Sequence, residues 1–404
     1  MDTFHHTVNK REVKQHASFV LRLALKLIAI TENTPVATLI DIVISAAVRC
    51  TSIEQTCQHH EDAPCGKTVR THLEQQFNDI QDVEVRINRG LRNNIPKQLR
   101  RKPLKVAIDC LEIGYYGTPD GEDVLRTSKP KDGTSRFHTY ASAYVVEKGQ
   151  RYTLAITFVT ASDSMLDVVR RLNKRLIQLA IRVELYLLDR GFYTVEVIRW
   201  LITYNKSFIM PVRVFGKKPK EGKPLTGMRR LKASKVSHWE QYTLHSQKAG
   251  EVTFDVAVCC DNFRGKRGRQ GKRARHGRRT LVYATYGVKH HSFDWIRETY
   301  RSRFGIESSH RQVRAMKIKT TTTNTAMRFF YLGISFILRN IWVWLHWNIF
   351  SQKQRGPGGR KIQLFRFSLD FLKAWLGAVI DEIYGLYDQI PVDQLLPAEM
   401  LRSG

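Results

Sequence analysis

The pattern of apolar and polar positions changes along the chain, and its first hundred residues have a helical period. Over 17–30 and 36–48 apolar side chains recur at the three- and four-residue spacing of a helix. Ser52 and Gln55 resemble a capping box, which predicts a short helix over 53–59, and 67–77 again has a helical pattern. Residues 1–100 are therefore expected to form an all-helical domain.

The period becomes that of a sheet after residue 103. An apolar run over 104–110 predicts a buried strand, and 136–146 and 150–160 alternate around a glycine turn, as in a hairpin. A helix over 163–180, a strand over 182–188, a helix over 194–204 and a strand over 207–212 follow. This order predicts a mixed α/β sheet in residues 101–212, preceded by a cationic linker over 93–102.

Three further segments complete the expected division of the chain. Residues 213–285 contain β-like stretches at 242–246, 252–259 and 280–286 between Lys/Gly/Pro-rich sequences, which predicts a β-rich basic insertion. Residues 286–350 return to a helical pattern, over 293–317 and 325–350, with Gly305 as a possible point of division in the first. A basic Pro/Gly linker over 352–361 leads into a C-terminal helical region, 351–404.

The charge of the chain indicates a polyanionic partner. The 66 Lys and Arg residues outnumber 37 Asp and Glu, for a formal charge of +29. Nucleic acid is the expected partner because each neutralised phosphate releases counterions. The block 264–279 packs nine Lys/Arg among four glycines, and we expect it to follow DNA phosphates rather than only to increase solubility. Its candidate DNA-binding residues are Arg264, Lys266, Arg267, Arg269, Lys272 and Arg273.

A second candidate DNA-binding element lies near the N-terminus. The short helix over 53–59, a turn over 62–66 and a helix bearing Lys67 and Arg70 suit a helix-turn-helix module. An ordinary helical bundle is the alternative, because the pattern lacks a sharp consensus.

Two apolar stretches raise the question of a membrane. The stretch 17–30 carries Arg22 and Lys26, and 329–350 is interrupted by Arg339 and Asn340. Charges at mid-span are costly in lipid, so both are predicted to be buried core helices, with no membrane partner. The N-terminus lacks a secretory signal, and six scattered cysteines fit a reducing cytoplasm, where the chain would associate with the nucleoid.

Three acidic residues are the candidates for chemistry. Asp109 and Asp189 each lie near the carboxyl end of an apolar run, and α/β sheets bind ligands at that edge. Gly191 allows a sharp turn after the second run. With Glu307 as a third carboxylate, the set suits Mg²⁺ or Mn²⁺, which prefer hard oxygen ligands. Two such ions support in-line phosphoryl transfer.

The third acid lies within a distinctive pattern. On a single helix, Tyr300, Arg303, Glu307 and Arg314 would share one stripe, as expected for a metal-binding carboxylate flanked by cations that bind phosphates. An exposed helix with an incidental pair between Arg303 and Glu307 is the alternative.

The spacing Tyr300-x2-Arg303-x3-Glu307-x6-Arg314 resembles the Y-(2)-R-(3)-E-(6)-K signature of a group of insertion-sequence transposases. These carry a DDE triad on an RNase H-like fold. The Val-Ala-Ile run into Asp109, the Leu-Leu run into Asp189 and the β-rich insertion before Glu307 occur in the same order. Arg314 departs from the usual Lys, which keeps the charge but changes its geometry.

The resemblance implies a mixed-sheet, RNase H-like catalytic core interrupted by a β-rich insertion and preceded by an all-helical DNA-binding domain. It makes Asp109, Asp189 and Glu307 a triad for two Mg²⁺ or Mn²⁺ ions. It makes Tyr300, Arg303 and Arg314 contacts to the transposon end.

The implied reaction is cleavage of double-stranded DNA at terminal inverted repeats, followed by transfer of the 3′-OH into target DNA by a homodimer. Members of the group often form a hairpin at the element's ends, which requires a flipped base and an aromatic side chain such as Trp239 or Trp295. Two alternatives stay open: an RNase H-like, structure-specific nuclease, and a catalytically silent DNA-binding protein derived from a transposase.

Overall fold

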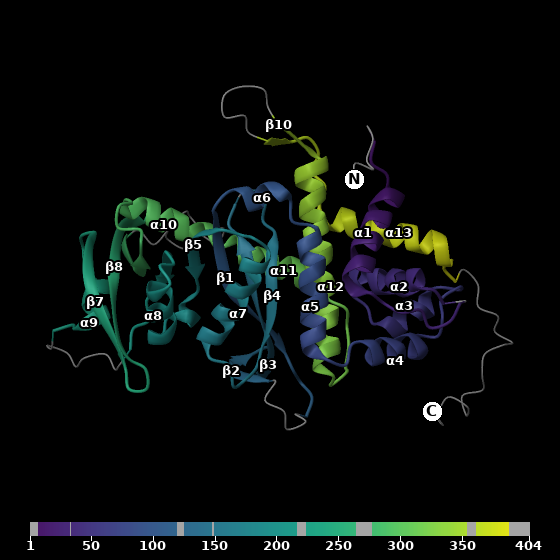
Figure 1. The fold of residues 1–404 in the computed structure, drawn as a ribbon, viewed down its shortest axis with the longest axis horizontal. Coiled ribbons are helices and arrows are strands. Elements are labelled where there is room, and N and C mark those ends of the chain that lie inside the picture. Colours follow the sequence, from purple (N-terminus) through teal and green to yellow (C-terminus); the bar gives the residue numbers. More distant parts are fainter. Residues whose placement is uncertain are drawn as a thin grey trace. The chain divides into compact units, whose positions relative to one another are not determined.

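Two units share the chain, and each draws on separate parts of the sequence (Figure 1). The computed structural model describes residues 7–32, 34–118, 125–147, 149–215, 224–263, 277–353 and 361–387. By their internal contacts, residues 1–90, 313–342 and 365–404 form a helical unit, and residues 91–312 and 343–364 form an α/β unit. The five-segment division expected from the sequence stays a prediction about independently folding domains.

The helical unit contains the helices that the N-terminal pattern predicts. The helix α2 (Val36–Arg49) is buried along most of its length, α3 (Ile53–His59) begins at the Ser52–Gln55 capping box, and α4 (Gly66–Gln76) follows. The first helix, α1 (Lys10–Leu25), begins earlier than the apolar pattern predicts, at a capping box of Asn9 and Glu12. A C-terminal helix, α13 (Leu369–Tyr384), packs against α1 and α2.

The long helix α12 (Thr325–Trp344) continues through a short π-helix, Leu345–Ile349. The combined span is long and apolar enough to cross a membrane, and 83% of its most apolar window is buried. Arg339 and Asn340 within it are 2% and 0% exposed. One bent pair, Val36–Arg49 with Ile53–His59, passes the same test of length and composition.

One mixed sheet of nine strands is the centre of the α/β unit. The antiparallel strands β1 (Leu104–Gly114), β3 (Thr134–Val145) and β4 (Thr153–Val159) lie beside the parallel strands β5 (Val183–Leu188) and β6 (Phe208–Pro211). A short polar strand, β2 (Arg126–Lys131), pairs with the start of β3. The mixed α/β sheet predicted from the sequence is confirmed.

The strands of the expected insertion extend this same sheet. The strands β7 (His238–Ser246), β8 (Gly250–Phe263) and β9 (Gly277–Tyr286) contain the three predicted β-like stretches. Because β9 pairs with β6, the sheet runs without interruption in the order β2-β3-β1-β5-β6-β9-β8-β7. A short helix that the sequence pattern does not predict, α9 (Gly227–Ala233), precedes β7 and contacts β9.

Helices cover both faces of the sheet. Leu185 and Leu187 join an apolar cluster with Ile296 of α10 (Phe293–Ser302) and Ile306 of α11 (Gly305–Arg314). Tyr186 points to the opposite face, where its hydroxyl donates a 2.7 Å hydrogen bond to Asn173. That face carries α7 (Met165–Gln178), and α8 (Val195–Thr203) packs against β7 and β8.

The connections differ most from the prediction. The expected linker over 93–102 contains the end of α5 (Ile80–Asn93) and a short helix, α6 (Lys97–Arg101). The expected linker over 352–361 is bounded by a pair of short strands, β10 (Ser351–Lys353) and β11 (Lys361–Gln363). Over 293–317, the structure has two helices with a break between Ser302 and Gly305.

Candidate active site

The sheet places the two aspartates side by side. In the parallel ladder of β1 and β5, the last pair is Ile108 with Leu188, so Asp109 and Asp189 are the next residues on neighbouring strands. Ala107 and Leu187 belong to the cluster beneath α10 and α11. Because side chains alternate along a strand, the two acids point to that same face.

The two aspartates differ in their position on the strands. Asp189 directly follows β5, as predicted, and its side chain accepts a hydrogen bond from the Gly191 amide. Asp109 was expected near the end of a strand, but β1 continues to Gly114 because it stays paired with β3. Asp109 therefore lies inside a strand, with its neighbour Ser142 on β3.

The third acid lies on a helix that begins close to the sheet. The Tyr144 hydroxyl donates to the Gly305 carbonyl at 3.2 Å. A Cβ at Gly305 would lie 3.0 Å from that hydroxyl and 3.1 Å from the Arg151 guanidinium carbon. Glycine thus allows the close approach that starts a new helix here, and Tyr300, Arg303 and Glu307 do not share one helical stripe.

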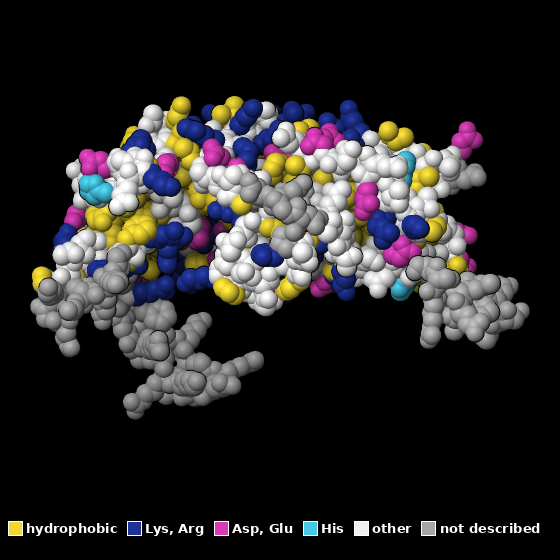
Figure 2. All heavy atoms as spheres, turned by 90° about the horizontal axis from the view of Figure 1, so that it is seen from below, with side chains coloured by type: hydrophobic (Ala, Val, Ile, Leu, Met, Phe, Trp, Pro, Cys, Tyr) yellow, Lys and Arg dark blue, Asp and Glu magenta, His cyan; other side chains and the backbone are white. Residues whose placement is uncertain are grey.

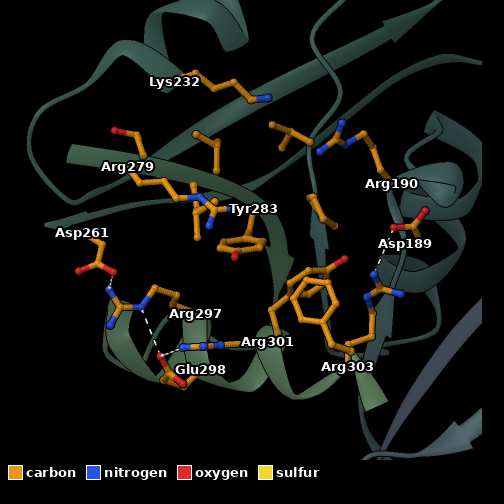
Figure 3. A pocket seen from close by; sticks show the side chains of 17 residues that line it. Asp189, Arg190, Lys232, Asp261, Arg279, Tyr283, Arg297, Glu298, Arg301 and Arg303 are labelled. Atoms are coloured by element: carbon orange, nitrogen blue, oxygen red, sulfur yellow. Dashed lines mark ion pairs between the residues drawn. The ribbon is translucent and has the colours of Figure 1, made fainter. Parts of the chain in front are cut away.

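All three carboxylates converge on the guanidinium of Arg303. Its Nη1 lies 3.2 Å from Asp109 Oδ2, and its Nη2 lies 3.5 Å from both Asp189 Oδ1 and Glu307 Oε1. Figure 3 shows the pair with Asp189. Arg303 is 4% exposed, whereas the side chains of Asp189 and Glu307 are 43% and 57% exposed. The acids thus surround a buried cation and are open to solvent on the other side.

Burial controls the protonation of this cluster. Removal from water raises the pKa of Asp109 to about 6, the negative charges of Asp189 and Glu307 act in the same direction, and Arg303 opposes them. Burial disfavours the charge of Arg303, but Tyr300 and the three carboxylates outweigh it and raise the pKa of Arg303. The guanidinium therefore stays charged and partly neutralises the acids.

The donor set fits a divalent metal ion in its chemistry. Carboxylate oxygens are the ligands that Mg²⁺ and Mn²⁺ prefer, and here three surround one positive charge. Among the described residues, no three His, Cys, Asp or Glu side chains stand close enough to share an ion, since Arg303 lies between these acids. Its buried Nε has no hydrogen-bond partner, so this guanidinium is incompletely satisfied.

A second contact fixes the helix that carries Glu307. His310, one turn further along α11, lies with its Nε2 2.9 Å from the Ser142 hydroxyl on β3. Both residues are buried, and Ser142 is the register partner of Asp109. This contact therefore joins the helix of the third acid to the strand beside the first acid.

The predicted DNA contacts Tyr300 and Arg303 are buried in this structure. The Tyr300 hydroxyl donates to the Leu188 carbonyl at 3.3 Å, and its ring packs against Tyr283 and the Arg303 guanidinium. DNA contact by either residue would require it to move. The sequence gives no signal for this, because a charge on a helix does not reveal whether it faces solvent or an acidic cluster.

The other predicted DNA contacts have no test in the geometry. Lys67 and Arg70 are exposed on α4, and Arg314 is the exposed last residue of α11. Arg264, Lys266, Arg267, Arg269, Lys272 and Arg273 lie outside the described residues. The two candidate base-catching tryptophans are partly buried: Trp239 packs against Phe293, and Trp295 stacks on His291.

Beside Asp189 the sequence analysis missed a cationic cavity of about 690 Å³ (Figure 3). Its walls include Arg190 after β5, Lys232 on α9, Arg279 on β9 and Arg301 on α10. Phe304, in the break between α10 and α11, is 52% exposed and also lines it. No pattern in the sequence identifies this site, because its residues come from segments far apart in the chain.

Comparison with known proteins agrees with this site. The family described as "Transposase DDE domain" matches residues 101–341, more than half of the chain. A search of the curated proteins finds no match. Among solved structures, the chain is similar to the one titled "Cryo-EM structure of piggyBac transposase synaptic complex with hairpin DNA (SNHP)". That similarity has 10% sequence identity and a TM-score of 0.47, and covers 99% of this chain and 80% of the other.

The family match spans all three converging acids, the sheet that places them and the helix that carries Glu307. The expectation of a DDE transposase is thereby confirmed at the level of the family, while the narrower signature group stays a prediction. This chain belongs to the transposase DDE domain family.

Proposed function

We propose that this transposase cleaves double-stranded DNA at terminal inverted repeats and transfers the resulting 3′-OH into target DNA. The convergence of Asp109, Asp189 and Glu307 on one buried cation carries the proposal. Three acids from distant parts of a strongly basic chain would repel one another unless a positive charge joined them. The order β4-β3-β1-β5-β6, antiparallel then parallel, supports an RNase H-like core.

The three acids are the proposed ligands of two Mg²⁺ or Mn²⁺ ions. When bound, such ions activate a water or a 3′-hydroxyl and stabilise the leaving oxygen. Asp189 and Glu307 face solvent, while Asp109 must lose its proton before it can act as a ligand. Arg303 neutralises the acids beforehand and must turn away from them, which frees its guanidinium for a DNA phosphate.

The proposed partners are the transposon ends and the target DNA, bound by a homodimer in the cytoplasm close to the nucleoid. Exposed Lys67 and Arg70, Arg314 and the block 264–279 are the proposed phosphate contacts outside the acidic cluster. Phe304 is exposed beside the acids and is better placed than Trp239 or Trp295 to stack on an extruded base, if a hairpin forms.

Glu307→Gln tests the triad. The substitution removes one negative charge and keeps the shape, so we expect cleavage of a DNA end in Mg²⁺ to fall at least about 100-fold while end binding stays within twofold. Glu184→Gln makes the same chemical change at an exposed position of β5 and serves as the control. Cleavage at the wild-type rate by Glu307→Gln would remove Glu307 from the triad.

The two alternative functions give different results with a pre-cleaved DNA end that carries a free 3′-OH. A transposase joins this end to a second duplex, whereas a structure-specific nuclease yields no joined product. A catalytically silent DNA-binding protein would neither cut nor join, and Asp109→Asn would then leave its biological effect unchanged.

A further inference from the structure

The cavity beside Asp189 has an excess of positive charge that the protein does not neutralise. Six cations and three carboxylates line it. Two of those carboxylates, Asp261 and Glu298, pair with Arg297, at 2.7 and 3.6 Å. The third, Asp189, pairs with Arg303 in the acidic cluster. The carboxylates of the wall are therefore already engaged.

Three cations face the cavity without a carboxylate partner among the described residues: Arg190, Lys232 and Arg279. Each comes from a different element and is exposed, and Figure 3 shows all three around the same space. Burial lowers the pKa of Lys232, and the charges of Arg190 and Arg229 lower it further. Cations held together against their repulsion form a site that an anion would stabilise.

The size of the cavity limits what can enter. A volume of about 690 Å³ lies within the range of pockets that enclose a small molecule, so it admits a few nucleotides of one strand but not a duplex. The apolar part of its wall includes the exposed ring of Phe304, and single strands bind where cations and an aromatic face occur together. In Figure 2, Lys and Arg side chains gather in a hollow toward the left of the view, in the α/β unit.

We infer that this cavity binds the backbone phosphates of an unpaired DNA strand beside the acidic cluster, through Arg190, Lys232 and Arg279. The inference rests on the proposed function only in taking DNA as the partner. Arg190 directly follows Asp189, so the bound strand runs close to the acids. The contacts are to phosphates and do not depend on base sequence.

Lys232→Ala combined with Arg279→Ala tests the inference in the full chain. The probes are a blunt duplex and the same duplex with a five-nucleotide single-stranded extension, 3′ in one and 5′ in another. Binding is measured with a chelator present and over a range of salt, so that no cleavage is needed. We expect one extension to increase wild-type affinity, the double variant to lose that gain, and the salt slope to fall by about 1.4, or about 0.7 for each phosphate contact.

Two further variants control for charge and for folding. Arg170→Ala with Lys174→Ala removes the same charge from exposed positions of α7, which do not line the cavity, and is expected to keep the gain. Lys232→Arg with Arg279→Lys keeps the charges and is expected to keep most of the gain. Thermal unfolding shows whether each variant is folded.

Three results would overturn the inference: no gain from either extension in the wild type, the same gain in the double alanine variant, or equal losses for blunt and extended DNA. A small-anion site would instead appear as stabilisation of the wild type by inorganic pyrophosphate, absent in the double variant, with no effect on the extension. Failure of cleavage in Mg²⁺ would count against the proposed function and leave these binding results intact.

Discussion

Arg303 holds the acidic cluster together as a single side chain. Its guanidinium contacts Asp109, Asp189 and Glu307, and it is nearly inaccessible to solvent. A divalent ion that binds the same carboxylates must compete with this charge. Arg303 therefore stabilises the metal-free site and weakens metal binding, two effects that one substitution can separate.

Arg303→Gln is expected to lower the melting temperature in chelator and to bind Mn²⁺ several-fold more tightly, as measured by titration calorimetry. The loss of stability should stay below the roughly 3–5 kcal/mol typical of a broken buried pair, because two of the three acids are about half exposed. Arg297→Gln is the matched control, since Arg297 also pairs with three carboxylates, Asp261, Asp294 and Glu298, outside the triad. Equal Mn²⁺ affinity of Arg303→Gln and wild type would contradict the competition.

The raised pKa of Asp109 predicts a dependence of stability on pH. The folded state holds this proton up to about pH 6, whereas the unfolded chain releases it near 3.8. The stabilising contribution of the neutral carboxyl is therefore complete below pH 3.8 and is lost as pH rises to about 6, by at most about 3 kcal/mol.

Asp109→Asn should remove this part of the pH dependence, because an amide does not titrate. Urea unfolding in chelator, compared between wild type and variant at pH 4 and pH 7, measures it. A difference between the two proteins that stays constant over this range would show that the Asp109 carboxyl is not perturbed.

At this scale the sequence predicted which acids matter but not what surrounds them. The resemblance singled out Asp109, Asp189 and Glu307, and the structure brings all three to Arg303. The cavity cations escaped prediction, because only tertiary structure brings Lys232 and Arg279 near Asp189.

Among the elements, α11 has the closest relation to chemistry because it carries Glu307. Three contacts hold it to the sheet: the Tyr144 hydroxyl on the Gly305 carbonyl, the His310 ring beside the Ser142 hydroxyl, and Ile306 in the apolar cluster. A small shift of this helix would change the distance of the third acid from the other two. Contacts far from DNA thus control the geometry of the triad.

Ser142→Ala should remove the hydrogen bond to His310 at a cost of about 1 kcal/mol. We expect DNA cleavage to fall more than tenfold while DNA binding in chelator is unchanged, because the acids are displaced and the phosphate contacts are not. Thr243→Val is the control, since it removes a hydroxyl pair with Thr253 between β7 and β8. An equal effect of both variants on cleavage would assign Ser142 to general stability.

The accuracy of the predicted elements followed the strength of their signals. The helices α2 and α3 agree with prediction almost to the residue, because apolar periodicity and a capping box mark them. The strand β2 has the sequence Arg-Thr-Ser-Lys-Pro-Lys and no apolar alternation, so only pairing with β3 reveals it. The break before α11 escaped prediction because a helix tolerates an isolated glycine, and the contacts of Gly305 are tertiary.

For the whole molecule, the helical unit depends on chain far from its N-terminus. Asp381 on α13 pairs with Arg49 and with His60, and the Tyr384 hydroxyl donates to the buried carboxyl of Asp41 at 3.3 Å. A contiguous N-terminal domain is what the sequence suggests, since periodicity reports each helix but not its partners. The structure assigns 365–404 to the same unit.

A fragment of residues 1–100 should therefore lack a fixed core. Without α13, the apolar surface of α1 and α2 and the buried Asp41 and His60 lose their partners. We expect helical far-ultraviolet circular dichroism but no cooperative thermal transition, in contrast to the full chain. A sharp transition in the fragment alone would establish it as an independent domain.

The pairing of β9 with β6 restricts how this enzyme can be re-engineered. Exchange of residues 213–285 for the corresponding region of a relative might be attempted as a cassette swap to change end preference. Such a graft would remove the neighbour of β6 and leave its edge open to aggregation. A workable chimera must keep β9 and place its junctions inside the hairpins beyond it.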